Sequence, residues 1–119
     1  MIISIDDSSE VPIYMQIRNQ IVQGISDGRL SLGEQLPTVR GLADEIGINS
    51  MTVNKAYQLL KQDGYIVTGR RNGASVRTDI PREKTLSQAS RDNLEHIISE
   101  AKISGMTLGD FMELCRKMY

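Results

Sequence analysis

The chain of 119 residues has few of the residue types on which enzymes and secreted proteins commonly depend. It contains no tryptophan, one cysteine (Cys115) and one histidine (His96). A single cysteine excludes an internal disulfide and a multi-cysteine metal cluster. A lone histidine with no nucleophile motif around it gives no support to a catalytic triad. We therefore expect structural roles for both residues, and no catalytic site, metal or cofactor.

Long hydrophobic runs are also missing. No apolar run approaches the roughly 18 to 20 residues that a membrane span needs, and the N-terminus lacks the layout of a signal peptide. The composition, 39% hydrophobic and 24% charged, is typical of a soluble globular protein. With one phenylalanine in the chain, the core must consist mainly of isoleucine, leucine, valine and methionine. The sequence predicts a cytoplasmic protein with one small domain and a helical appendage.

The formal net charge of −1 is unevenly distributed. Residues 1–11 hold three acidic and no basic side chains, residues 12–77 hold eight basic against five acidic, and residues 78–119 hold six against seven. The positive excess therefore falls in the middle segment. Binding to nucleic acid depends on where positive charge lies, not on the total, so this segment is the candidate for a nucleic-acid interface.

The N-terminal segment 1–11 starts with an apolar run and continues with acidic and serine residues, so we expect an extended arm whose apolar start pairs or packs. A helix is then predicted from Pro12, which suits a first helical turn, to about Asp27, where Gly28 ends it. The apolar residues recur at every fourth position, the spacing of one helix face: Ile13, Ile17, Ile21 and Ile25. The polar residues on the other face are expected to be solvated: Gln16, Arg18, Asn19 and Gln23.

The middle of the chain has the pattern of two short helices joined by a tight turn. Thr38 is a suitable N-cap for the first helix, and Gly47 supplies the left-handed residue that ends it. Asn49 is the predicted cap of the second helix, with Ile48 and Val53 at the spacing of a hydrophobic staple. This is the pattern of a helix-turn-helix, whose second helix enters the DNA major groove. Its expected buried side is Val53, Ala56, Tyr57 and Leu60.

Two β-prone runs follow, residues 65–68 and 74–77, on either side of the turn-prone loop 69–73. Before the helix-turn-helix, Gln35 and Leu36 are a candidate for a very short strand. A hairpin directly after a recognition helix is the wing of a winged helix. The sequence therefore predicts a winged helix-turn-helix.

Beyond this domain the chain changes character at Pro81, which biases the preceding residue towards extended conformations. Two helices are predicted there, one from about Arg82 to Ser104 and one that begins after the cap Thr107, with Gly105 between them. Two amphipathic helices totalling about 36 residues cannot bury both apolar faces against each other alone. We predict that a second copy of the chain covers them; the alternative is that both helices pack back onto their own domain. The predicted dimerisation residues are Leu94, Ile97, Ile98, Ala101, Leu108, Phe111, Met112 and Cys115.

Polar and basic side chains crowd the two helix starts and the hairpin turn. A helix N-terminus presents free amides and a positive dipole end to phosphate, and short polar side chains there can reach bases. A solvated helix would also be polar, but caps, staple, turn and hairpin all agree with DNA binding, and such consistency is better evidence than one feature. The candidate DNA-contacting residues are Thr38, Arg40, Asn49, Ser50, Met51, Thr52, Asn54, Lys55, Arg70, Arg71, Asn72 and Gly73.

Many positions between residues 10 and 77 resemble, in one order, the GntR family of transcription regulators. They are Pro12-Ile13-Tyr14, Gln16-Ile17, Gly28, Gly33, Leu36-Pro37-Thr38-Val39-Arg40, Leu42-Ala43, Gly47-Ile48, Thr52-Val53, Ala56-Tyr57, Leu60, Gly64-Tyr65-Ile66 and Gly73.

This resemblance implies a dimeric winged helix-turn-helix regulator that binds a palindromic operator. Arg40 resembles the family's base- or phosphate-contacting arginine, and residues 49–54 match its variable recognition positions. Thr38 stands where members often have serine, Asn54 where they often have arginine, and Arg71 where they usually have glycine at the wing tip.

The short two-helix tail is similar to that of the YtrA subfamily, where it serves mainly for dimerisation. The sequence thus predicts a mostly α-helical protein with a small β hairpin, organised as an arm (1–11), a DNA-binding domain (12–78) and a dimerisation region (79–119).

The predicted function is that of a homodimeric repressor that binds a palindromic operator in double-stranded DNA. Any small-molecule effector would bind at the dimer interface or between tail and winged domain. The alternative function is a winged-helix protein-interaction module without specific DNA binding. A small enzyme is the least favoured class.

Overall fold

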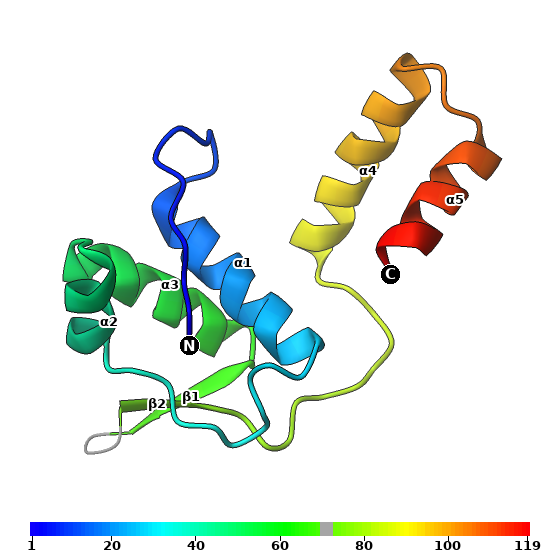
Figure 1. Ribbon diagram of the computed structural model, residues 1–119. Coiled ribbons are helices and arrows are strands. Elements are labelled where there is room, and N and C mark those ends of the chain that lie inside the picture. The colour runs from blue at the N-terminus through cyan, green and yellow to red at the C-terminus, as the bar shows by residue number, and fades with distance from the viewer. Residues whose placement is uncertain (70–72) are drawn as a thin grey trace. The chain divides into compact units, whose positions relative to one another are not determined.

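The computed structural model of the chain describes residues 1–69 and 73–119. Figure 1 shows the elements in chain order, and the predicted mostly helical fold with one hairpin is confirmed. The elements are α1 (Ile13–Ser26), α2 (Val39–Ile46), α3 (Ser50–Gln62), β1 (Ile66–Gly69), β2 (Gly73–Val76), α4 (Gln88–Ile103) and α5 (Leu108–Met118). The chain divides into two compact units, Met1–Pro81 and Arg82–Tyr119.

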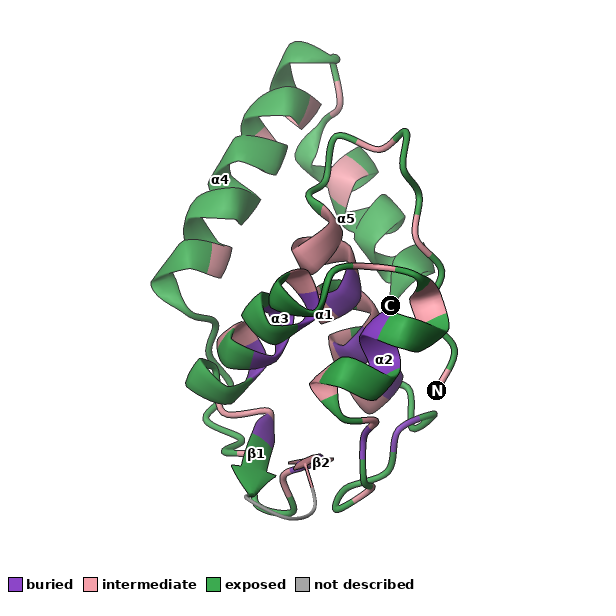
Figure 2. Cartoon of the chain, turned by 90° about the vertical axis from the view of Figure 1, so that its left-hand side faces the viewer, coloured by how far each residue is buried: buried purple, intermediate pink, exposed green. Residues whose placement is uncertain are grey.

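The first unit has one continuous core, in which α3 packs against both α1 and α2. The four-residue repeat of α1 places Ile17 and Ile21 in this core with no exposed surface. The predicted buried side of α3 is confirmed, with Tyr57 as the one aromatic residue in the core. Figure 2 shows this buried material concentrated where the three helices meet. Full burial of each large aliphatic side chain contributes about 1.5–3 kcal/mol.

The hairpin pairs β1 with β2 in antiparallel register, with Ile66 opposite Val76. Both strands lie one residue nearer the turn than predicted, because Gly69 and Gly73 pair with each other and extend the ladder. The short strand predicted before α2 is present as a single bridge between Gln35 and Ser75. This extra pairing fastens the segment that leads into α2 to β2, which therefore lies between that segment and β1.

The two caps and the turn of the helix-turn-helix are confirmed. The Thr38 hydroxyl oxygen accepts a hydrogen bond from the Gly41 amide at 3.0 Å, and the Asn49 side-chain oxygen accepts one from the Met51 amide at 2.7 Å. Gly47 ends α2 with a φ of +70°, a left-handed conformation that glycine adopts without steric cost. These three positions set where α2 ends and where α3 begins.

The polar face of α1 was predicted to be solvated, and for two residues this is wrong. Gln16 hydrogen bonds to the backbone of Asp6 and Val11, so it holds the N-terminal arm. Arg18 pairs with Asp63 at 3.4 Å. The physical reason lies in the tertiary structure, because the arm and the end of α3 lie beside this face. Periodicity alone cannot show that a polar face has neighbours.

The second unit begins its first helix later than predicted, at Gln88 and not at about Arg82. Ser87 is the N-cap, its hydroxyl accepting a hydrogen bond from the Ser90 amide at 3.2 Å. Lys84 has a φ of +54°, which is incompatible with a continuing right-handed helix. The second helix is capped as predicted, by a reciprocal pair between Thr107 and Asp110. No residue of this unit is buried.

Candidate nucleic-acid interface

The turn end of β2 lies against the N-cap of α2. Gly73 has a φ of +67°, and a Cβ atom at this position would lie 3.3 Å from the Thr38 methyl carbon. A larger residue would therefore be strained and would press on the cap. Because the same threonine caps α2, this contact holds the wing and the start of α2 in one arrangement.

The helix α3 is joined to the same region through Tyr57. The Tyr57 side chain is buried, and its hydroxyl donates a hydrogen bond to the Pro37 carbonyl oxygen at 2.7 Å. Burial raises the pKa of Tyr57 far above its ordinary value, with a smaller contribution from the negative charge of Glu45. The phenol therefore stays protonated and remains a donor. We call Pro37, Thr38, Tyr57 and Gly73 the junction.

Replacing Tyr57 with phenylalanine should test this contact. We expect the Tyr57→Phe variant to lose about 1–2 kcal/mol of unfolding free energy, because the partly buried Pro37 carbonyl is left without its donor. Urea denaturation followed by circular dichroism measures the loss. The matched control is Tyr65→Phe, since the Tyr65 hydroxyl has no hydrogen bond within the described residues. An equal effect of the two substitutions would contradict a specific role for Tyr57.

Side chains at the start of α3 are free to meet a ligand. Ser50, Met51 and Asn54 are exposed, Met51 to 77%, and Thr52 is half-buried. Arg40 is exposed in the first turn of α2. Neither helix has an acidic residue in its first turn. The positive ends of both helix dipoles are therefore uncompensated by nearby carboxylates and favour an anion such as phosphate.

Besides Thr38, two of the predicted contact residues already have partners. The Asn49 side-chain oxygen serves as the α3 cap, which leaves its NH₂ group for any outside contact. The Lys55 ammonium lies 4.0 Å from the centre of the Tyr14 ring, a cation–π contact with α1. The sequence analysis predicted the Asn49 cap but missed the contact between Lys55 and Tyr14. To contact DNA, the Lys55 ammonium would have to leave the Tyr14 ring or contact the DNA while it stays against the ring.

The predicted wing-tip residues Arg70, Arg71 and Asn72 lie outside the described residues. Gly73, at the end of the wing, is described and belongs to the junction. The candidate interface that the structure describes therefore consists of the starts of α2 and α3 and of Gly73 at the turn end of β2. Among the described residues, no group of histidine, cysteine, aspartate and glutamate side chains is placed to hold a metal ion.

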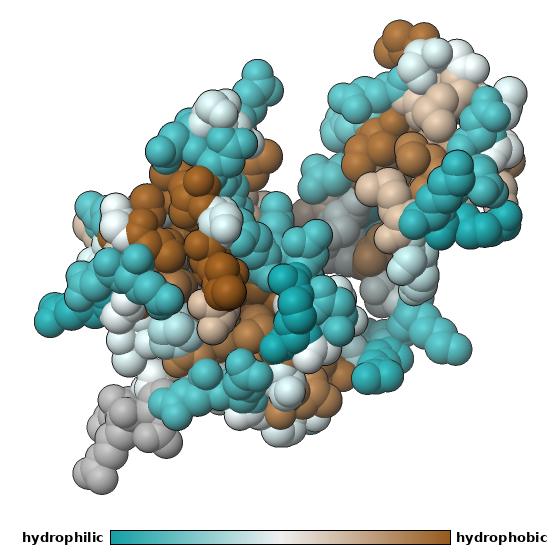
Figure 3. All heavy atoms as spheres, in the orientation of Figure 1, coloured by the Kyte–Doolittle hydropathy of each residue, from teal (hydrophilic) through white to brown (hydrophobic). Residues whose placement is uncertain are grey.

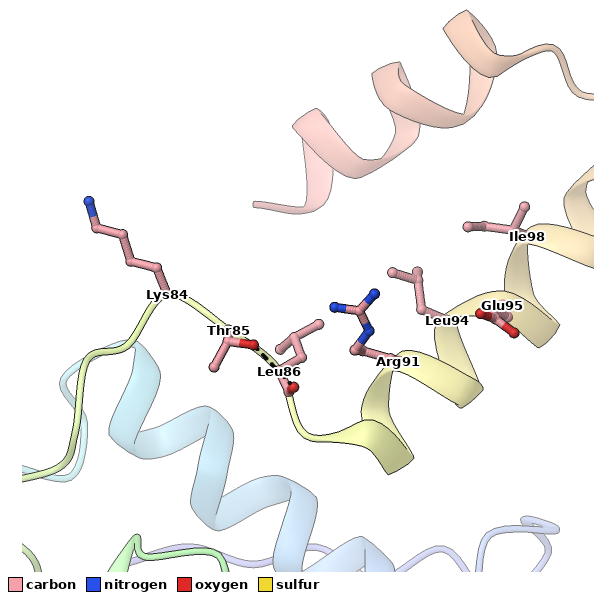
Figure 4. A pocket seen from close by; sticks show the side chains of 7 residues that line it. All are labelled: Lys84, Thr85, Leu86, Arg91, Leu94, Glu95 and Ile98. Atoms are coloured by element: carbon pink, nitrogen blue, oxygen red, sulfur yellow. Dashed lines mark hydrogen bonds between the residues drawn. The ribbon is translucent and has the colours of Figure 1, made fainter.

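The predicted dimerisation residues form exposed or half-buried apolar faces on α4 and α5. Ile97 is 50% exposed and Leu108 is 75% exposed, while Ile98, Ala101 and Phe111 are half-buried. Leu94 and Ile98 also line a pocket of about 610 Å³ together with Leu86 and Arg91. Figure 4 shows Arg91, Leu94 and Ile98 projecting from the same side of α4. None of these side chains is buried.

The described residues contain no helix that is both long and apolar enough to cross a membrane. Residues 13–76 match the family model described as "Bacterial regulatory proteins, gntR family". The chain is 32% identical to the HTH-type transcriptional repressor YtrA of Bacillus subtilis, over 98% of this chain and 91% of that protein.

Two solved structures are also similar. YtrA of Sulfolobus acidocaldarius, a GntR-family transcription factor, is 36% identical over 98% of this chain and 95% of its own, with a TM-score of 0.58. The DNA-binding domain of AraR in complex with operator ORX1 is 25% identical over 61% of this chain and 90% of its own, with a TM-score of 0.54.

Proposed function

The chain belongs to the GntR family of bacterial regulatory proteins, and we propose that it is a repressor that binds a palindromic operator as a homodimer. The family makes it a DNA-binding transcription regulator with a helix-turn-helix. The observation that carries the more specific proposal is the set of exposed polar residues at the start of α3. α3 is joined to the segment that leads into α2 through the Tyr57–Pro37 hydrogen bond, and neither helix has an acidic residue in its first turn.

We propose that α3 enters the major groove and that the wing lies beside it. Ser50, Thr52 and Asn54 are suited to bases or phosphates, because asparagine can pair bidentately with adenine and the threonine methyl can contact thymine. Met51 supplies an apolar contact. Arg40 contacts a phosphate or a base from α2, and the Thr38 hydroxyl, which accepts a hydrogen bond as a cap, can still donate one to a phosphate. The wing-tip residues are proposed as DNA contacts because of the resemblance to the GntR family.

Dimerisation is the second part of the proposal. The apolar faces of α4 and α5 are uncovered within their unit, so a second copy of the unit is the partner of matching chemistry. A two-fold dimer presents two recognition helices, which calls for a palindrome with half-sites about 10–10.5 base pairs apart or a multiple of that spacing. A protein bound there would obstruct transcription, as the name of the Bacillus subtilis relative suggests. Its place of action is the cytoplasm, where bacterial DNA lies.

Substituting the proposed contact residues tests the interface directly. Arg40→Ala and Thr52→Ala should each weaken operator binding by about 1–3 kcal/mol, or roughly 5- to 150-fold, if each reads a base or a closely held phosphate. A salt-controlled gel-shift titration against the DNA upstream of the protein's own gene measures the change. Arg29→Ala is the control for loss of one positive charge, since Arg29 pairs with Asp27, the C-cap of α1, and is not a proposed contact. Unchanged binding by both variants would refute the assignments.

A second candidate function is a winged-helix module that binds proteins and has no sequence-specific affinity for DNA. It predicts weak binding that is the same for the upstream DNA and for a scrambled fragment of equal length. The same gel shift distinguishes the two functions. A reporter gene placed behind the upstream DNA then separates repression from activation, because loss of a repressor raises expression.

A further inference from the structure

The N-terminal arm is held in an extended conformation by two glutamine side chains of α1. The Gln20 amide accepts a hydrogen bond from the Ser4 N–H at 2.9 Å and donates one to the Ser4 carbonyl at 2.6 Å. The Gln16 amide does the same for Asp6, at 2.9 Å in both directions. Each carboxamide thus takes the place that a peptide group of a neighbouring strand would occupy.

The spacing explains why this arrangement works. Residues four apart in a helix are separated by about 6.0 Å along the axis, and residues two apart in a strand by about 6.6–6.8 Å. Gln20 therefore matches Ser4 in register, and Gln16 matches Asp6. The arm then has the alternation of a strand: Ile3 and Ile5 pack against the core, while Ile2 is 89% exposed.

One edge of the arm remains open. In an extended strand the backbone groups of successive residues point to opposite edges. Those of Ser4 and Asp6 face α1, so those of Ile3 and Ile5 face away from it. Within the described part of the chain, the backbone groups of Ile3 and Ile5 make no hydrogen bond. An unpaired strand edge is a template for another strand.

The open edge borders a groove of about 460 Å³, whose other side is the end of α2 and the turn that follows it. Five isoleucines line the groove: Ile2, Ile3, Ile5, Ile46 and Ile48. Figure 3 shows hydrophobic residues gathered over the arm and the helices beside it. The groove thus combines a free backbone edge with an apolar floor, the two features used in recognition by strand addition.

The charge of the groove is negative. Asp7 and Glu45 line it, both are exposed, and neither is paired with a basic side chain in the described residues. No basic residue lines it. The C-terminal end of α2 opens onto the same place at Gly47, and the negative end of a helix dipole adds to the two carboxylates. A cationic occupant is therefore favoured, and nucleic-acid phosphate is repelled.

We propose that this groove binds an extended, cationic segment of a partner protein, which adds to the arm as a β-strand. Alternate apolar side chains of that segment enter the isoleucine floor, and a lysine or arginine meets Asp7 and Glu45. None of the residues that line the groove is among the proposed DNA contacts, so the groove gives the regulator a protein contact made by different side chains. A second copy of this chain is a poorer occupant, because its arm carries Asp6 and Asp7 into an already acidic groove.

A labelled peptide tests the proposal on the full chain. The probe is fluorescein-labelled Lys-Val-Ile-Val-Lys, and fluorescence anisotropy measures its binding. We expect saturable binding, no saturable binding of the Glu-Val-Ile-Val-Glu analogue, and loss of binding when alternate residues of the lysine peptide are N-methylated, since this removes the donors that face the arm. Hydrogen exchange at the Ile3 and Ile5 amides should slow when the lysine peptide is bound.

Two matched double variants identify the groove. Asp7→Asn with Glu45→Gln should weaken peptide binding about fivefold or more, while Glu83→Gln with Glu100→Gln, the same charge change in the second unit, should leave it unchanged. Operator affinity, measured in parallel, should stay within about twofold for both. Equal peptide binding by the two variants, or by the N-methylated probe, would overturn the proposal. So would Ile3 and Ile5 amides that are protected without peptide and lose protection on dilution, since a second copy would then occupy the groove.

Discussion

Removal of residues 82–119 should turn the protein into a monomer and weaken its binding to a full palindromic operator by about 100-fold or more. The reason is avidity: joining two DNA-binding units raises the effective concentration of the second one, typically for a gain of 10²–10⁴. The removed segment contains the apolar faces of α4 and α5, which are uncovered within their own unit. The remaining segment keeps the whole buried core. Sedimentation velocity measures the mass, and gel shift measures the affinity.

A single half-site is the internal control for this deletion. The truncated and full-length proteins should bind an isolated half-site with similar affinity, because the deletion removes none of the proposed contact residues. A truncated protein that remained a dimer and kept full affinity for the palindrome would refute the dimerisation role of α4 and α5. A full-length protein that sedimented as a monomer would favour the alternative, in which these helices cover only their own chain.

Replacing Leu42 with alanine should cost about 2–5 kcal/mol of unfolding free energy, because large-to-small changes in a packed core remove apolar contacts and leave a cavity. Leu42 has no exposed surface and is one of two buried residues of α2. A domain of ordinary stability has about 5–15 kcal/mol in total. The variant should therefore unfold at a much lower urea concentration, and its operator binding should fall as the angle between α2 and α3 loosens.

Leu32→Ala makes the same chemical change at a position that is 52% exposed. It should alter the unfolding free energy by no more than about 0.5 kcal/mol and leave operator binding unchanged. If Leu42→Ala were no more destabilising than Leu32→Ala, α2 would not be anchored through this side chain. If Leu42→Ala destabilised the fold yet bound the operator with unchanged affinity under native conditions, the α2–α3 angle would not control recognition.

The sequence was sufficient to predict the helix-turn-helix because its signals are local. Thr38, Gly47 and Asn49 act on residues no more than four positions away, through caps and a left-handed turn. The buried face of α3 was also predictable, since a helix period of 3.6 residues selects it without knowledge of the partner. The same holds for Thr107, the predicted cap at the start of α5.

The features that were missed depend on residues far apart in the chain. Gln16 bonds to a segment ten residues earlier, and Lys55 lies over the ring of Tyr14, on another helix. Tyr57 was predicted to be buried, but nothing nearby indicates that its hydroxyl reaches Pro37. The start of α4 was missed for a different reason: residues 82–87 include charged residues that helices tolerate, and their backbone course is set by a positive φ at Lys84.

The junction has a consequence for how this regulator can change over evolutionary time. Pro37, Thr38, Tyr57 and Gly73 hold α2, α3 and the wing to one another, whereas the side chains of Ser50, Met51 and Asn54 take part in none of these bonds. The residues that hold α2, α3 and the wing in place are thus different from the residues proposed to contact the bases. Substitution at Ser50, Met51 or Asn54 can retarget the protein to a new operator while the fold keeps its stability. Substitution of a junction residue would instead disturb recognition of every operator alike.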